Sequence, residues 1–268
     1  MKRIANLLLL ACFAAAASAQ TAQVPRTPDR TTPTKIYIED GGVNEVLQSI
    51  YIPPLLNAPF TAIVHTEWTR PMANGGTYTF VNQRMVARDG RGRIYEQRWL
   101  LAPRGSEDQS RMNVIQIADP VARTLYNCFT LRTPHRCELE KYAELPLTSY
   151  KPLVLASGPL GNGQGSRVHE DLGKRLIEGI ETEGTRDTVD YNAGVMGSDQ
   201  PFSIWREFWQ SPQIGVNLYS EVANPSVGKQ VFTLSDVLLS EPDPRLFELP
   251  DGFEVIDHRK PPAVERPQ

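Results

Sequence analysis

Long hydrophobic runs are scarce in this 268-residue sequence, and the clearest one lies at its start. Residues 4–17 are apolar, follow the basic pair Lys2 and Arg3, and lead into the small triplet Ala17-Ser18-Ala19. The run is shorter than the roughly 20 apolar residues that a membrane-spanning helix needs. A basic start, a short apolar core and small residues before a cleavage point are typical of a secretory signal peptide. We therefore expect cleavage after Ala19 and a periplasmic or extracellular protein without a transmembrane segment.

An excess of positive charge is also lacking. Lysine and arginine number 28 against 31 aspartate and glutamate residues, so the formal net charge is −3 at pH 7, and Lys2 and Arg3 leave with the signal peptide. Nucleic-acid binding depends on clustered basic side chains that neutralise phosphates. The charge balance therefore argues against a nucleic-acid partner and against tight docking on an anionic bilayer.

Cysteine is rare, with three residues in the chain. Cys12 falls within the signal peptide, which leaves Cys128 and Cys137 in an oxidising compartment. If residues 124–131 and 135–142 pair as an antiparallel hairpin, these two cysteines face each other directly, at a distance that suits a disulfide. We expect that disulfide, because the Cys-x-x-Cys spacing of a redox-active dithiol is missing.

An alternative use of Cys12 starts from the residues before it. Leu9-Leu10-Ala11-Cys12 loosely resembles the lipidation motif of bacterial lipoproteins. Cleavage at this point would leave a short apolar core, and residues 13–17 after it stay apolar instead of forming a polar tether. Plain secretion is therefore the expected outcome, with lipidation of Cys12 as the alternative.

Catalytic, metal and cofactor motifs are absent. No two of the four histidines (His65, His135, His169 and His258) have metal-ligand spacing. The glycine-rich stretch 158–165 lacks the Gly-Lys-Ser/Thr of a phosphate-binding loop, and no Gly-x-Ser-x-Gly motif is present. We expect no metal, no cofactor and no catalytic residue that the sequence can identify.

Helical periodicity is also scarce, apart from one expected short helix near residues 42–50. Residues 20–34 are rich in Thr, Pro, Arg and Asp, and residues 259–268 contain three prolines. Such segments bury too little apolar surface to offset the entropy of ordering them. We expect a disordered leader over 20–34, a single β-rich domain over 35–258 and a disordered tail over 259–268.

Alternation with a period of two dominates the region after residue 60. Phe60, Ala62, Val64, Thr66 and Trp68 fall on one face of an expected strand. Turn signals such as Asp89-Gly90 and Gly184 separate further stretches of this kind. The expected strands cover residues 60–69, 77–88, 93–102, 113–118, 124–131, 135–142, 168–183, 185–192, 202–210, 215–223 and 229–239. This pattern predicts a mainly β fold, a curled, half-barrel-like antiparallel meander of about ten strands with little helix.

Large aromatic side chains occupy both faces of one expected strand. Over 202–210, Phe202 and Phe208 alternate with Trp205 and Trp209, so one core cannot easily bury all four. A twisted antiparallel sheet with a second apolar face curls over a helix or a ligand. We therefore predict an apolar concavity. The candidate ligand-binding residues are Trp68, Trp99, Trp205, Trp209, Phe202 and Phe208. The alternatives are that these rings fill the core, or that some stack on a sugar ring.

Several segments resemble an uncharacterised family of exported bacterial proteins. They include Glu170-Asp171-Leu172-Gly173, Arg206-Glu207-Phe208-Trp209, and the stretch from Ser240 to Pro250, within a resemblance that covers roughly residues 58–256. The expected meander, closed by a Leu-Phe-x-x-Pro segment, is also similar to the periplasmic lipoprotein-carrier fold, a curled half-barrel whose concave face shelters acyl chains. This chain is longer than those carriers and lacks clear helices to line such a cavity.

These observations favour a non-catalytic binding protein over an enzyme. Its expected ligand is a lipid, an acyl chain or another apolar group in a concave sheet, and its expected partner is an apolar or amphipathic small molecule or an acylated protein. An envelope-polymer hydrolase that uses paired carboxylates, and a structural module without a ligand, are the alternatives.

Overall fold

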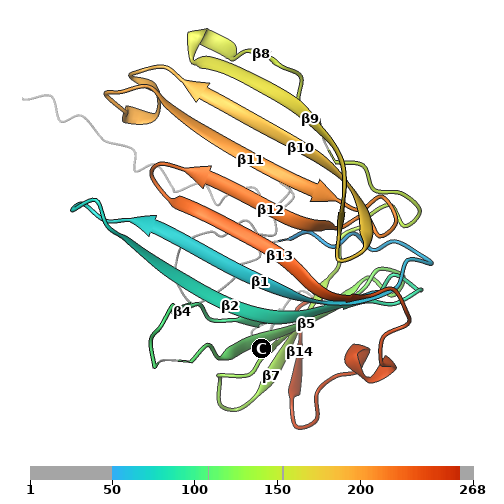
Figure 1. The fold of residues 1–268 in the computed structure, drawn as a ribbon. Coiled ribbons are helices and arrows are strands. Elements are labelled where there is room, and N and C mark those ends of the chain that lie inside the picture. The colour runs from blue at the N-terminus through green and yellow to red at the C-terminus, as the bar shows by residue number, and fades with distance from the viewer. Residues whose placement is uncertain (1–49, 108, 153, 260–268) are drawn as a thin grey trace, which may run out of the picture. The chain divides into compact units, whose positions relative to one another are not determined.

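The computed structural model describes residues 50–107, 109–152 and 154–259. The expected signal peptide, the leader, the short helix before residue 50 and nearly all of the expected tail lie outside these residues. The described part contains fourteen β-strands and three short 3-10 helices (Figure 1). Among its helices, none is long and apolar enough to cross a membrane.

The long strands follow the expected ranges closely, apart from one hairpin. The strands are β1 (Phe60–Pro71), β2 (Thr77–Arg88), β3 (Ile94–Trp99), β4 (Ala102–Pro103), β5 (Met112–Asp119), β6 (Thr124–Phe129), β7 (Arg136–Lys141), β8 (Gly158–Pro159), β9 (Gly165–Ile177), β10 (Ile180–Tyr191), β11 (Phe202–Gln210), β12 (Asn217–Asn224), β13 (Gly228–Leu238) and β14 (Glu254–Asp257). The helices are η1 (Gly161–Gly163), η2 (Val195–Gly197) and η3 (Pro244–Phe247). The structure has more strands than the expected ten or so because it also contains β4, β8 and β14. These strands are only two to four residues long and were not predicted as separate elements.

All strands belong to one sheet. Thirteen of them follow the order β14-β7-β6-β5-β3-β2-β1-β13-β12-β11-β10-β9-β8, and β4 pairs with β2. Two antiparallel meanders, β1 to β7 and β8 to β13, are joined where β1 pairs with β13. Among the strand pairs of the described residues, only β14 with β7 is parallel. The prediction of a mainly β antiparallel meander is confirmed.

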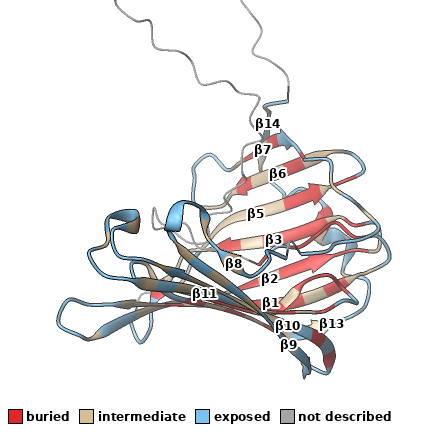
Figure 2. Cartoon of the chain, turned by 90° about the horizontal axis from the view of Figure 1, so that it is seen from above, coloured by how far each residue is buried: buried red, intermediate tan, exposed pale blue. Residues whose placement is uncertain are grey.

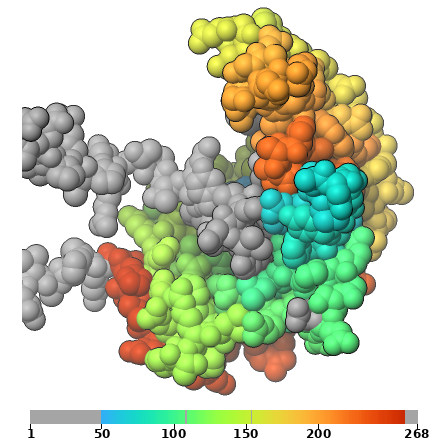
Figure 3. Space-filling model, turned by 90° about the vertical axis from the view of Figure 1, so that its left-hand side faces the viewer, coloured from blue at the N-terminus to red at the C-terminus, as the bar shows by residue number. Residues whose placement is uncertain are grey.

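The sheet is strongly curved and open, as Figures 1 and 3 show. Long antiparallel strands twist, and a β-bulge bends the strand that carries it. Register shifts of this kind occur between β9 and β10 at Gly184, between β11 and β12 at Gln210, and between β1 and β13 near Ile63. The expected curl therefore has local causes along the sheet.

One face of the sheet carries the main hydrophobic core. Alternate residues of β1 from Phe60 to Trp68 are buried on this face, which we call the inner face, and the opposite face is the outer face. Ile50 and Ile52, from the extended segment before β1, pack into the same core, as do Ile214 and Val216 before β12. Figure 2 shows that burial is concentrated on the β1 to β7 half, whereas β9 to β11 are mostly half-buried or exposed.

The prediction that a turn at Gly184 separates two strands is wrong. Strands β9 and β10 instead turn at Glu178 and Gly179, which have φ angles of 51° and 74° and fit the two-residue turn that hairpins prefer. Gly184 lies within β10, where an added Cβ would come within 2.6 Å of the Trp209 ring. The glycine therefore makes room for an indole from the next strand.

The expected disulfide is present. Cys128 on β6 and Cys137 on β7 are directly opposite in the antiparallel register, are bonded to each other, and are fully buried. The hairpin that the spacing predicted is therefore cross-linked near its turn.

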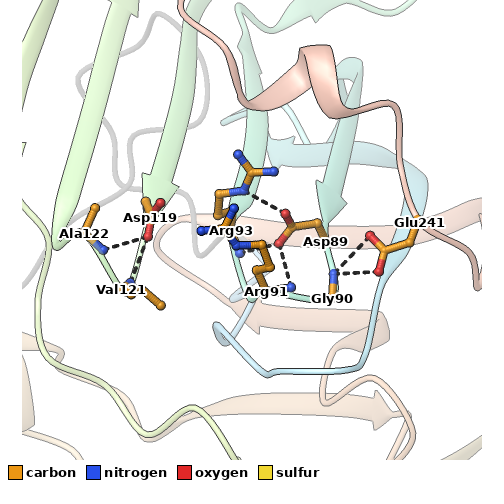
Figure 4. A network of polar contacts seen from close by, with 8 residues as sticks. All are labelled: Asp89, Gly90, Arg91, Arg93, Asp119, Val121, Ala122 and Glu241. Atoms are coloured by element: carbon orange, nitrogen blue, oxygen red, sulfur yellow. Dashed lines mark hydrogen bonds and ion pairs between the residues drawn. The ribbon is translucent and has the colours of Figure 1, made fainter.

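The expected turn at Asp89 and Gly90 joins β2 to β3 and also holds a distant segment (Figure 4). The Asp89 carboxylate accepts hydrogen bonds from the backbone N–H groups of Arg91 and Arg93 at 3.0 and 2.8 Å, and pairs with the Arg93 guanidinium at 2.7 Å. The backbone N–H of Gly90 donates to the Glu241 carboxylate. Glu241 precedes η3, whose Phe247 packs on the outer face against Ala87, Tyr95 and Ile117.

Arg88 connects three parts of the chain on the inner face. Its guanidinium is fully buried and donates to the backbone carbonyls of Pro53 at 2.6 Å, Ala58 at 2.6 Å and Ile214 at 2.8 Å. Burial lowers the pKa of Arg88 to about 10. The side chain thus ties the segment before β1 and the loop before β12 to strand β2.

Arg88→Lys is predicted to lower the free energy of unfolding by about 2–4 kcal/mol. A single ammonium cannot reach all three carbonyls, and buried acceptors without donors cost about 1–3 kcal/mol each. Denaturant unfolding measures the loss, and Arg91→Lys, at an exposed position in the neighbouring turn, is the matched control. Equal stability of the two variants would contradict this role of Arg88.

Candidate ligand cavity on the inner face

The connection between β7 and β9 crosses the inner face. In the sheet order β7 lies next to one end and β9 next to the other. The connection between them, described over residues 142–152 and 154–157 and called the crossing segment, spans the strands in between. The backbone N–H of Leu56 donates to the carbonyl of Leu147 at 2.8 Å, and the rings of Tyr51 and Tyr150 lie 5.2 Å apart. At its far end the Ser157 hydroxyl accepts a hydrogen bond from the backbone N–H of His169. The segment is thus held at its middle and at its end.

A cavity of about 370 Å³ lies between the crossing segment and strands β9 to β12. This volume is within the range of about 300–1,000 Å³ that is typical of small-molecule sites. The crossing segment contributes Tyr150, Pro152 and Val154. The strands and the start of β12 contribute His169, Glu183, Thr185, Asp187, Phe208, Gln210 and Asn217.

The lining combines apolar surface with polar groups whose charges are paired. Phe208, Pro152 and Val154 provide the apolar part. His169 Nδ1 lies 2.7 Å from Asp187 Oδ1 across the β9 and β10 pair, and Glu183 lies 3.3 Å from the ammonium of Lys174. The cavity can therefore accept an apolar chain and form hydrogen bonds with a polar group attached to it.

Apolar surface continues from the cavity along β11. Phe202, Ile204 and Phe208 share the inner face and are only half-buried, and Phe202 stacks on Tyr191 at a ring distance of 5.0 Å. The exposed Arg206 lies on the same face between Ile204 and Phe208. Phe208 and Phe202 are six residues apart on one strand, a span of roughly 20 Å. On the crossing segment, Val154 and Leu155 are 60% and 41% exposed. The described residues thus leave a strip of largely apolar surface open beside the cavity, with the charged Arg206 side chain inside it.

The six aromatic residues proposed from the sequence do not form one site. The Trp68 side chain is 1% exposed in the inner-face core, and its indole N–H donates to the Val227 carbonyl at 3.0 Å. Phe202 and Phe208 face inward, whereas Trp205 and Trp209 face outward. Trp99 and Trp205 line two separate outer-face cavities of about 800 and 350 Å³.

Trp209 belongs to a packed group of aromatic and charged side chains on the outer face. The Arg175 guanidinium lies 3.8 Å from its ring centroid, and its indole N–H donates to Glu207 at 2.7 Å. Burial acts to raise the pKa of Glu207, but the hydrogen bonds from Trp209 and Arg186 outweigh it, so this pKa is lowered. Burial and a hydrogen bond to Glu221 raise the pKa of Tyr219 beside this group. Trp209 is thus held within a charged network and is only 7% exposed.

The crossing segment and the pairing of His169 with Asp187 were not predicted from the sequence. Within β9, His169 and its neighbours Glu170 and Asp171 alternate in direction, so spacing along the strand does not bring them together. The turn at Glu178 and Gly179 could have indicated the cross-strand pairing approximately, but the bulge opposite Gly184 shifts the register by one residue. No group of three or more His, Cys, Asp or Glu side chains that could hold a metal ion occurs in the described ranges.

Comparison with known proteins finds similarity at the level of solved structures. No family model and no curated protein matches the sequence. An uncharacterized conserved protein from Thermus thermophilus is 8% identical with a TM-score of 0.39, over 75% of this chain and 91% of that one. A LolA-superfamily protein from Nitrosomonas europaea is 9% identical with a TM-score of 0.29, over 72% and 91% of the two chains. A chain of the MucA/MucB complex of Pseudomonas aeruginosa is 13% identical with a TM-score of 0.33, over 73% of this chain and 58% of its own length. The expected weak similarity to lipoprotein-sorting proteins is therefore found.

The tyrosine pair that holds the crossing segment predicts a dependence of stability on pH. Burial raises the pKa of Tyr150, and burial together with Tyr150 raises the pKa of Tyr51 above 10.0. As the pH rises past about 10, the unfolded chain loses these protons first, so the contribution of the pair is complete below pH 10 and declines above it.

The double variant Tyr51→Phe, Tyr150→Phe is therefore expected to lose less stability between about pH 9 and 11 than the unmodified protein. Denaturant unfolding at each pH measures the difference. Arg88 has a lowered pKa and acts in the opposite direction, but it is present in both proteins and cancels in the comparison. Parallel pH profiles would contradict the raised pKa values of these two partly exposed phenols, which are 40% and 36% exposed.

Proposed function

We propose that this protein is exported and, without catalysing a reaction, holds the apolar chain of a lipid or of an acylated protein on the inner face of its sheet. The observation that carries the proposal is the cavity under the crossing segment together with the strip from Phe208 to Phe202, where Phe208, Ile204 and Phe202 are apolar and Arg206 is the one charged side chain. The strip is comparable in length with an extended long acyl chain.

Energetics support a chain as the occupant. Full burial of a Phe or Ile side chain is worth about 1.5–3 kcal/mol, and Phe202, Ile204 and Phe208 are all half-buried. Val154 and Leu155 add exposed apolar area on the opposite wall. A flexible acyl chain can cover both surfaces without any change in the sheet.

Charge supports an uncharged link next to that chain. The two carboxylates in the lining already have cationic or hydrogen-bonding partners, because Asp187 contacts His169 and Glu183 contacts Lys174. The amide groups of Gln210 and Asn217 lie in the same lining and both donate and accept hydrogen bonds. An ester or amide, the groups that join acyl chains to glycerol or to an amino terminus, suits these partners.

Export is supported by the start of the sequence and by the disulfide. The signal-peptide pattern of residues 1–19 directs a chain out of the cytoplasm, and the Cys128–Cys137 bond suits an oxidising compartment. A periplasmic or extracellular location fits a carrier of envelope lipids.

The hydrolase alternative has weaker support. Glu181 and Glu183 lie on one face of β10, but both contact the ammonium of Lys174, at 2.9 and 3.3 Å. Because one ammonium engages both carboxylates, neither is free to act as the paired acid and base of a hydrolase.

Fluorescent acyl probes of short and long chain length test the proposal on lipid-extracted protein. Phe208→Ala is expected to weaken binding of both probes about tenfold, because Phe208 lines the cavity. Phe202→Ala is expected to weaken only the long probe, because Phe202 lies at the far end of the strip. Phe253→Ala, at the opposite end of the sheet where Phe253 stacks on His135, is the matched control.

Failure of both probes to bind, or an equal effect of all three variants, would contradict the proposal. Mass spectrometry of lipid extracted from the purified protein adds an independent reading, since a carrier is expected to retain an acyl compound from its host.

A further inference from the structure

A second and larger cavity, of about 800 Å³, lies on the outer face where β1, β2, β3 and β13 run side by side. Because it lies on the opposite face of the sheet, it is separate from the acyl cavity. Its lining residues are Ile63, His65, Asn82, Gln83, Arg84, Met85, Gln97, Trp99, Gln109, Ser110, Ser235 and Asp236. Apart from Arg84, His65 and Asp236, the polar members of this set are uncharged amides and hydroxyls.

Trp99 forms a fixed apolar wall of this cavity. Its indole N–H donates to Gln97 Oε1 at 2.9 Å, and the same oxygen accepts the backbone N–H of Met85 at 3.3 Å. The amide nitrogen of Gln97 donates to the Tyr95 hydroxyl at 3.1 Å. With its one polar atom occupied and its orientation held by an anchored glutamine, the indole offers only its apolar surface to a ligand.

In contrast to the apolar Trp99 wall, β1 and β13 contribute a hydrogen-bonded series of polar side chains. His65 Nε2 lies 2.8 Å from the Ser235 hydroxyl, and that hydroxyl donates to Asp236 Oδ2 at 3.2 Å. Asp236 has a φ angle of 53° next to the bulge between β1 and β13, an uncommon conformation for a residue other than glycine. These groups form a relay that both donates and accepts hydrogen bonds, as vicinal hydroxyls require.

Charge disfavours an anionic ligand at this site. The guanidinium of Arg84 is almost fully buried and donates to the Thr66 hydroxyl at 3.0 Å, whereas Asp236 is exposed. A phosphate or carboxylate would meet the Asp236 carboxylate before any free cation. A neutral ligand encounters no such penalty.

We propose that the outer cavity binds a neutral saccharide unit, with one face of the sugar ring against Trp99 and its hydroxyls on Gln83, Ser235 and Asp236. A sugar ring combines an apolar C–H face with hydroxyls that donate and accept, and this is the combination that the lining offers. A site of this kind allows an exported protein to contact a glycan while its inner face holds an acyl chain. The saccharide site does not depend on the acyl site.

An array of neutral glucose, mannose and N-acetylglucosamine oligomers, with uronic-acid oligomers as anionic comparators, tests the proposal on the folded protein. The neutral oligomers are expected to bind and the anionic ones to bind more weakly. The strongest neutral oligomer is then titrated by calorimetry. Trp99→Ala is expected to weaken it at least tenfold and Ser235→Ala about threefold. Trp205→Ala, in the separate outer-face cavity, is the matched control and is expected to leave affinity unchanged.

Gln83→Met serves as a second lining variant if Trp99→Ala does not fold, and it is expected to weaken binding. Acyl-probe binding is expected to stay unchanged in these variants, which separates the two sites. Absence of binding to every neutral oligomer, a preference for the anionic oligomers or for peptides, or loss of binding in Trp205→Ala rather than in the lining variants overturns the proposal.

Discussion

Pairing between the first and last long strands is the constraint on which the rest of this structure depends. Because β1 and β13 are neighbours in the middle of the sheet, the two meanders extend in opposite directions and place β7 and β9 near opposite ends. The chain between them has to cross the inner face. Two extended segments, residues 50–57 and residues 142–152 with 154–157, lie over this face and contact each other and Arg88 or β12.

Those two segments cover the inner face unevenly, so apolar side chains are left unburied on one half of the sheet. In the β1 to β7 half the inner side chains are tightly packed. They include the fully buried Arg88, whose guanidinium donates hydrogen bonds to backbone carbonyls. No residue of β9 is buried, and β11 buries only Trp209, on the outer face. The apolar side chains of this half are therefore in excess of what the core needs. On the outer face, by contrast, Trp209 and its charged neighbours contact one another, whereas Trp99 and Trp205 line cavities.

The sequence predicted the features that depend on neighbouring residues. The turn at Asp89, the hairpin with its disulfide at Cys128 and Cys137, and the opposite directions of Phe208 and Trp209 follow from local spacing. The prediction of a turn at Gly184 was wrong because this glycine lies within a strand, where its missing side chain makes room for the Trp209 ring of the next strand. An apolar concavity was predicted, but its lining by Tyr150 and Pro152 was not, because these residues meet Phe208 only through the order of strands in the sheet, which depends on pairings distant in sequence.

Covalent mapping with a photoreactive fatty acid, carrying its reactive group along the acyl chain, tests the central claim most directly. The account predicts adducts on the crossing segment around Tyr150 to Leu155 and on β11 between Phe202 and Phe208. Adducts confined to the outer-face residues around Trp99 and Ser235, or labelling that free fatty acid does not displace, would contradict it.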